Sequence, residues 1–189
     1  MRKHLALLLL TAAVLALAPS AFAADKPLPP VGQPIIVTTC GQSPGAVMVK
    51  MSCVQAKLAA EHNNKLTAAD LKGKGYKTLI VTTGTSMKGM GAAGTNVDTE
   101  VKRVKELIAE AKKQGMLVVA AHVEGMSRRV DKSDQTSIDA VLPDAGLILV
   151  VNDSDKDGYF TKYAASHGKP ILKVSDALGI GAGMKKLAK

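Results

Sequence analysis

The chain has 189 residues, a formal net charge of +9, two cysteines and no tryptophan. The basic surplus favours anionic partners, but the scarcity of aromatic residues argues against nucleic acid, because single-strand binding normally stacks bases on aromatic side chains. The lack of tryptophan also argues against a sugar site, and the length suits one well-cored domain.

Residues 1–23 have the order of a secretory signal peptide. A short basic start precedes the apolar run from Leu5 to Leu17, and the small residues of an A-x-A cleavage site follow it. We expect cleavage between Ala23 and Ala24 and export to the periplasm or beyond. Stable membrane insertion is not expected after cleavage, because the apolar run is too short for a permanent span.

The remaining chain reads as an extended leader at 24–33, where three prolines gather, and a single domain at 34–189. Short runs rich in β-branched residues predict strands at 34–39, 76–83, 116–123, 147–151 and 171–174. Helical spacing of apolar residues predicts helices at 44–60, 97–115, 133–142 and 159–167. The pattern of residues 61–75 is ambiguous. It is compatible with one more edge strand near 64–67, followed by a turn of helix at 68–71.

The predicted strands lack polar alternation, which is typical of parallel strands buried on both faces. Strands that alternate with helices through short connections imply right-handed crossovers. The sequence therefore predicts an α/β fold with a single doubly wound, mostly parallel sheet of five or six strands. Helices are expected on both faces, in a Rossmann-like or flavodoxin-like arrangement.

The two cysteines are predicted to be free thiols. Cys40 ends a predicted strand and Cys53 lies about nine residues along the next helix, or on the order of 13 Å away at 1.5 Å per residue. A disulfide needs Cα atoms within about 7 Å. We expect Cys53 to be a small core residue and Cys40 to lie nearer to a pocket.

Small, polar and charged residues gather after the strands, at the edge where ligands bind in doubly wound sheets. We expect Ser43 to be the N-cap of the following helix, whose free amides favour an anion. Cationic side chains from three other loops could balance the charge of that anion. The predicted ligand-binding residues are Gly41, Gln42, Ser43, Gly84, Lys88, Gly89, Arg128, Arg129, Lys156 and Asp157.

Three functions follow from these residues. The leading hypothesis is an exported protein that binds a small molecule with a carboxylate or phosphate-like group, with no catalysis assumed. The first alternative is an enzyme with Cys40 as nucleophile and His122 as general base. The second is a non-catalytic scaffold that acts through an unidentified protein partner.

The motifs that would indicate a cofactor are incomplete. Asp153, Asp155 and Asp157 open a calcium-loop pattern, but Ala164 stands where a bidentate glutamate belongs, so calcium stays a weak alternative and no other cofactor is predicted. The run from Gly89 to Gly94 matches G-x-G-x-x-G, but it begins well after its strand and lacks the expected acidic residue.

The segments TTCGQSPGA, YKTLIVTTGTSMKGMGAAG, HVEGMSRR and KDGYFTKYA together resemble an uncharacterised family of exported bacterial proteins, a domain of unknown function. The resemblance covers about Pro34 to Asp176 and implies a compact α/β domain. The family features matched here are G-Q-S at 41–43, the glycine-rich run at 88–94, R-R at 128–129 and K-D-G at 156–158. The resemblance implies no particular activity.

Overall fold

Five short runs of β-branched and other apolar residues, together with the short edge segment Ala60–His62, form one sheet in which every neighbouring pair of strands is parallel. The computed structural model describes residues 26–189, so the predicted signal peptide and its cleavage site lie outside the described residues. The strands are β1 (Ile35–Cys40), β2 (Ala60–His62), β3 (Thr78–Thr83), β4 (Leu117–His122), β5 (Leu147–Val151) and β6 (Ile171–Val174).

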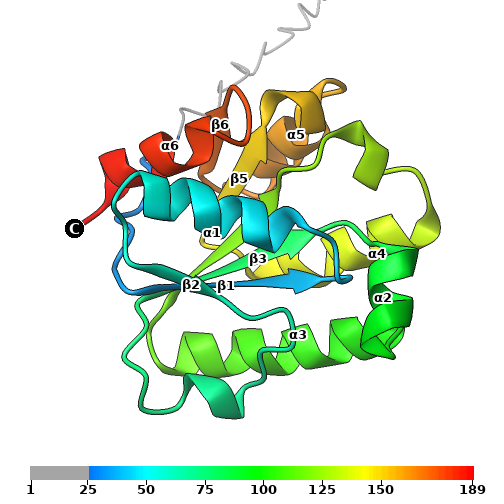
Figure 1. Cartoon of the computed structure of the whole chain (residues 1–189). Coiled ribbons are helices and arrows are strands. Elements are labelled where there is room, and N and C mark those ends of the chain that lie inside the picture. Colours follow the sequence, from blue (N-terminus) through cyan, green and yellow to red (C-terminus); the bar gives the residue numbers. More distant parts are fainter. Residues whose placement is uncertain (1–25) are drawn as a thin grey trace, which may run out of the picture.

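The spatial order of the strands is β2-β1-β3-β4-β5-β6, so the direction of winding reverses between β1 and β3. That order is the flavodoxin-like form of the doubly wound sheet. The predicted fold class is therefore confirmed. Figure 1 shows the helices, of which the first five lie between strands along the chain and the last follows β6, namely α1 (Gly45–Gln55), α2 (Met87–Ala93), α3 (Val97–Lys113), α4 (Lys132–Val141), α5 (Tyr159–Ser166) and α6 (Gly179–Leu187).

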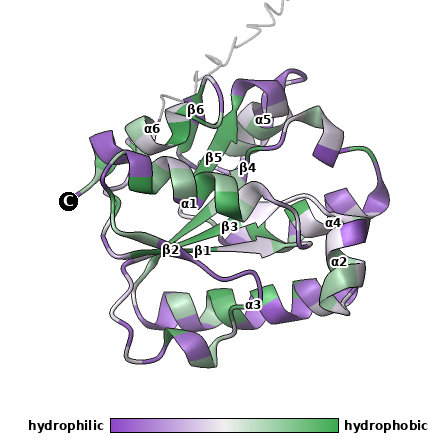
Figure 2. Cartoon of the chain, in the orientation of Figure 1, coloured by the Kyte–Doolittle hydropathy of each residue, from purple (hydrophilic) through white to green (hydrophobic). Residues whose placement is uncertain are grey.

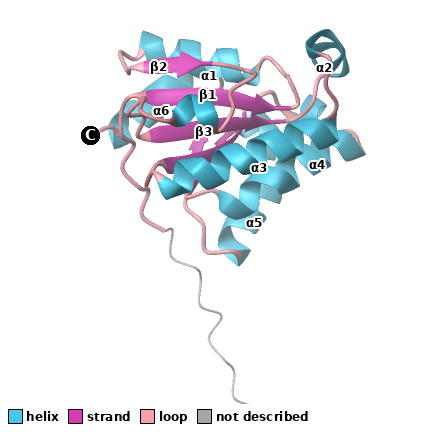
Figure 3. Cartoon of the chain, turned by 90° about the horizontal axis from the view of Figure 1, so that it is seen from below, coloured by secondary structure: helices cyan, strands magenta, loops and turns pink. Residues whose placement is uncertain are grey.

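The helices cover the sheet on both faces and enclose two apolar cores. α3, α4 and α5 pack on one face, and α1 and α6 pack on the other (Figure 3). Figure 2 shows mostly hydrophobic strands, whereas α3 alternates hydrophobic and hydrophilic residues along its length. None of the helices within residues 26–189 is long and apolar enough to cross a bilayer.

The two thiols lie in different cores. Cys40 belongs to the core under α3 and α4, and Cys53 belongs to the core under α1 and α6. Both are buried and free. The sheet itself therefore separates the two sulfur atoms, which agrees with the predicted free thiols.

The predicted boundaries are wrong in the region after the first helix. α1 ends at Gln55 rather than at residue 60, because Lys57 adopts a left-handed backbone (φ 63°) that turns the chain back toward the sheet. This early turn places the edge strand at Ala60–His62 instead of residues 64–67. A turn of 3-10 helix at Ala69–Leu71 agrees with the predicted turn of helix.

The leader predicted at 24–33 is extended, but its described part packs against the domain. Val31 is fully buried, its amide donates to the Leu187 carbonyl at 2.8 Å, and its carbonyl accepts from the Lys189 amide at 3.1 Å. The beginning and the end of the described chain are thereby joined at the face covered by α6.

Candidate functional site

The loops that follow β1 and β3 close the crevice at the point where the winding reverses. The Ser86 amide donates to the Gly41 carbonyl at 2.8 Å, and Gln42 and Thr85 form an isolated antiparallel bridge. α2 covers this bridge so closely that a Cβ atom at Gly89 would lie 2.2 Å from the Gln42 carbonyl oxygen. Gly89 therefore serves packing in this structure, because any side chain would displace the first loop.

A buried carboxylate on α3 holds the first loop from below. Glu100 is 2% exposed, and its Oε2 accepts from the Gly41 amide at 3.2 Å and from Gln42 Nε2 at 3.0 Å. Arg103 compensates this charge at 2.7 Å and also donates to the Thr39 carbonyl at 2.5 Å. The amide of Gly41, predicted to cradle a ligand together with the amide of Gln42, is thus engaged within the protein, as is the Gln42 side chain.

A second buried carboxylate holds the loop after β3. Asp134 on α4 accepts from the Thr85 amide at 2.7 Å and from the Thr85 hydroxyl at 2.8 Å. Ser137, one turn later, accepts from the Gly84 amide at 3.1 Å and donates to the Cys40 carbonyl. Gly84 is therefore also a structural position, and the two loops are rigidly anchored to the helices below them.

Ser43 does not cap α1, contrary to the prediction. Pro44 occupies the N-cap position with helical backbone angles (φ −70°, ψ −7°), so the helix begins one residue later, at Gly45. Ser43 is fully buried, and its hydroxyl has no hydrogen-bond partner within residues 26–189. A buried hydroxyl without a partner is uncommon and marks a place where a further polar group would be favourable.

The first amide of α1 binds a carboxylate that the protein itself supplies. Glu124, in the loop after β4, accepts from the Gly45 amide at 2.9 Å through Oε1 and from Arg128 Nε at 3.1 Å through Oε2. Arg128 also donates to the Thr85 carbonyl at 2.6 Å. We call Gly45, Thr85, Glu124 and Arg128 the Glu124 cluster.

The Glu124 cluster combines two features that favour an anion. The helix N-terminus contributes an amide that has no partner within the helix and a positive dipole end, and the guanidinium adds a full charge. Glu124 is nearly buried, with 8% of its side chain exposed, whereas 29% of Arg128 remains exposed. The cluster is thus reachable from solvent on the side of the arginine.

The other predicted cations do not join the Glu124 cluster. Arg129 turns away and makes a two-pronged ion pair with Asp157, at 2.8 and 3.0 Å, while its guanidinium stacks 4.3 Å above the ring centre of Tyr159. This pairing lowers the pKa of Asp157 to about 2. Lys156 pairs with Asp153 on the surface. Lys88 lies exposed in the first turn of α2 and makes no ion pair in the described part of the chain.

The three aspartates of the calcium-like pattern do not converge. Asp153 pairs with Lys156, Asp155 with Lys173 at 2.8 Å, and Asp157 with Arg129. No group of three or more histidine, cysteine, aspartate or glutamate side chains suited to a metal occurs within residues 26–189. The geometry therefore gives the calcium alternative no support, because each carboxylate is paired with a different cation.

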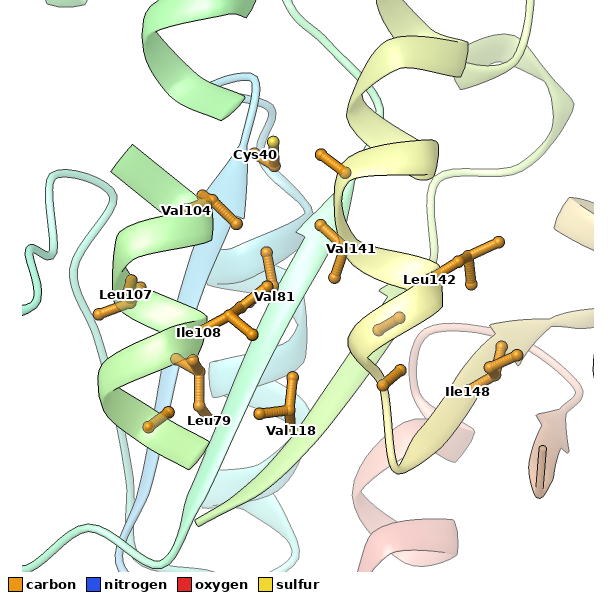
Figure 4. Close-up of a cluster of buried hydrophobic side chains, with 14 of the residues drawn as sticks. Cys40, Leu79, Val81, Val104, Leu107, Ile108, Val118, Val141, Leu142 and Ile148 are labelled. Carbon is orange, nitrogen blue, oxygen red and sulfur yellow. The ribbon is translucent and has the colours of Figure 1, made fainter. Parts of the chain in front are cut away.

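Cys40 and His122 occupy different, buried surroundings. The Cys40 side chain points into the apolar core between α3 and α4, as Figure 4 shows, and burial raises its pKa to about 11. His122 lies 2.9 Å from the Thr83 hydroxyl through Nδ1 and 3.3 Å from the Gly125 carbonyl through Nε2. Burial lowers the pKa of His122 to about 4. Both ring nitrogens thus have partners other than a thiol.

Glu100 and Glu124 are the carboxylates of the candidate site that the sequence did not lead us to predict, and each left a signal. Glu100 lies one helical turn before Val104, on the apolar stripe of its helix, where a charged residue is out of place. Glu124 lies two residues after the end of β4, at the edge predicted to bind ligands. Their partners could not be predicted, because the contacts join segments far apart in the chain.

The model of one protein family, a domain of unknown function (DUF6305), matches residues 32–188 of the chain. This match spans nearly all of the described structure. The chain belongs to the DUF6305 family. This agrees with the resemblance seen in the sequence. No curated protein matches the chain.

A solved structure of a GDSL-like lipase from Bacteroides thetaiotaomicron VPI-5482 is similar to this DUF6305 chain over 81% of its length and 83% of the lipase. The sequence identity is 10% and the TM-score is 0.38. A likeness at this level carries no argument about activity.

Proposed function

We propose that the protein binds a small molecule through a carboxylate or phosphate-like group at the Glu124 cluster, without changing it chemically. The observation that carries the proposal is the carboxylate of Glu124, held between the Gly45 amide and the Arg128 guanidinium. A position that accepts one carboxylate has the donors to accept another. The buried Ser43 hydroxyl, two residues before Gly45, supplies a further polar group without a partner among the described residues.

Binding of this kind is an exchange. The anionic group of the ligand accepts the hydrogen bonds that the Gly45 amide and Arg128 otherwise donate to Glu124, and the Glu124 side chain moves toward solvent. Because Glu124 is tethered, it competes at the high effective concentration of an intramolecular group. The proposal therefore requires that the ligand make contacts beyond its anionic group, and it predicts that removal of Glu124 strengthens the binding of simple anions.

Glu124→Ala is expected to bind propionate at least about tenfold more tightly than the native protein, because the tethered competitor is gone. Isothermal titration measures both affinities. Glu106→Ala, which removes an exposed carboxylate from α3, is the matched control and should behave like the native protein. In the Glu124→Ala background, Arg128→Ala should abolish the gain.

Equal affinities for propionate in the native protein and in Glu124→Ala would contradict the exchange. The function itself is tested by titrating the native protein with a pool of dicarboxylates, tricarboxylates and phosphate esters. We expect at least one member to bind, and Arg128→Ala to weaken it. No binding across the pool would overturn the proposed function.

An enzyme with Cys40 as nucleophile requires a reactive thiol. The burial of both cysteines predicts instead that their thiols react slowly. We expect neither cysteine of the native protein to react with iodoacetamide at pH 8 during the time that fully alkylates the urea-unfolded chain, because thiolate is the reactive form and burial disfavours it. Mass spectrometry counts the alkyl groups. Rapid modification of native Cys40 would revive its role as a nucleophile.

We also propose that the protein is exported and cleaved between Ala23 and Ala24, on the sequence pattern of residues 1–23. Sequencing of the N-terminus of the protein purified from its natural host tests this directly. A mature chain that begins at Ala24 is expected, and one that still begins at Met1 would contradict it. Action through a protein partner stays a prediction.

A further inference from the structure

A concave surface that shares no residue with the Glu124 cluster lies between α1 and the segment that leads from β6 into α6. It is a groove of about 620 Å³, and its lining includes Met48, Lys50, Met51, Ser52, Val54 and Leu178. Figure 1 shows α1 and α6 side by side on this face of the sheet. The groove is thus formed where the two helices approach each other.

The contact between α1 and α6 is fixed, so the groove is preformed. Ser52 donates to the Leu178 carbonyl at 3.1 Å and accepts from the Gly181 amide at 2.8 Å. A Cβ atom at Gly181 would lie 2.0 Å from the Ser52 carbonyl oxygen, which shows how closely the helices pack. These contacts hold Leu178 beside the outer face of α1.

The lining of the groove is unusually apolar for a surface. Met51 is 62% exposed, Val54 45% and Leu178 77%, and these are three of the five large apolar side chains that are strongly exposed within residues 26–189. Single exposed apolar residues are normal, but a group of them in a concavity indicates a binding surface. Methionine side chains also adapt easily to the shape of a flexible apolar ligand.

The charged residues around the groove are lysines, apart from Asp176. The two segments that form this face, 44–58 and 177–189, contain five lysines and no aspartate or glutamate. Lys50 lines the groove itself. Lys185, on α6, reaches the C-terminal end of α1 with its Nζ, which donates to the Ala56 carbonyl at 2.9 Å. The nearby Asp176 is engaged by the Leu178 and Gly179 amides. An anionic ligand is therefore favoured over a neutral or cationic one.

We propose that this groove binds a single-chain anionic amphiphile, a carboxylate with an unbranched hydrocarbon tail. The tail lies over Met48, Met51, Val54 and Leu178, and the carboxylate faces Lys50. The volume of the groove is in the range of small-molecule sites. A protein partner would need about 800 Å² of contact on each side, far more than this short stretch of one helix and one loop offers.

Sodium decanoate, kept below its micelle-forming concentration, is the probe for isothermal titration with the full exported chain. Decanoate should bind at least tenfold more tightly than either butyrate, which lacks the tail, or decyltrimethylammonium, which reverses the charge. Met51→Glu and Leu178→Glu should each weaken decanoate at least tenfold. Val130→Glu is the matched control, since Val130 is 74% exposed outside the groove, and it should leave binding unchanged.

Lys50→Gln should weaken decanoate severalfold and should not weaken decyltrimethylammonium, because the lost lysine attracts only the anion. Arg128→Ala should leave decanoate binding unchanged although it weakens the ligand of the Glu124 cluster, so that failure of the proposed function and failure of this inference are distinguishable. Absence of decanoate binding, or binding that survives both Met51→Glu and Leu178→Glu, would overturn the inference. Binding to phosphatidylglycerol vesicles that decanoate cannot displace would overturn it as well, in favour of a membrane surface.

Discussion

Arg103→Met is expected to lower the free energy of unfolding by about 3–5 kcal/mol, because it leaves the buried carboxylate of Glu100 without its cation. Arg103 also donates to the carbonyls of Thr39 and Leu66, so three segments lose a common partner. Urea denaturation followed by circular dichroism measures the loss.

Two variants test the reason for that loss. Lys102→Met replaces an exposed cation on the same helix and should change stability by no more than about 0.5 kcal/mol. Glu100→Gln, added to Arg103→Met, should recover part of the stability, because a neutral amide oxygen can still accept from Gly41. If the double variant were less stable than Arg103→Met alone, the unpaired charge would not be the cause.

Phe160→Ala is expected to cost about 3–5 kcal/mol, the usual loss when a large buried aromatic ring is truncated. Phe160 is 1% exposed and packs against His122, with ring centres 5.1 Å apart, and edge-on against Tyr159 at 5.0 Å. The cavity would open beside the loop after β4, which carries Glu124. Thermal and urea unfolding of the native protein and the variant give the difference.

Phe160→Leu keeps most of the apolar volume and should cost clearly less than Phe160→Ala. Because the ring supports the end of β4, we also expect Phe160→Ala to alter the environment of His122, which its side-chain resonances would report. Equal losses for leucine and alanine would show that volume is not what this position supplies.

The four central strands could be predicted because each is a short apolar run that is almost entirely buried, as in Thr78–Thr83. The edge strand β2 has the sequence Ala-Glu-His and lacks such a run, so it was misplaced. α2 was missed because its glycine-rich sequence has poor helix propensity. Its ends nevertheless carried signals, since Ser86 caps it through the Gly89 amide and Gly94 ends it with a left-handed backbone. α6 was missed for the same reason, as three of its nine residues are glycine.

The candidate site was predictable in its location and not in its pairing. Parallel strands bring their carboxyl ends to one edge, so loops there are expected to meet. Which cation meets which carboxylate depends on side-chain directions fixed by packing. Arg128 reaches the N-terminus of α1 through Glu124, whereas the adjacent Arg129 turns to Asp157 and Tyr159. Two neighbouring arginines in one sequence motif thus have different roles.

The backbone amide of Gly45 reports most directly on whether the start of α1 and Arg128 form an anion receptor. In Glu124→Ala, added propionate should shift the Gly45 amide proton resonance in a saturable way, and Arg128→Ala in that background should suppress the shift. In the native protein the same additions should leave the resonance nearly unchanged. A Gly45 resonance that does not respond to propionate once Glu124 is removed would contradict the account.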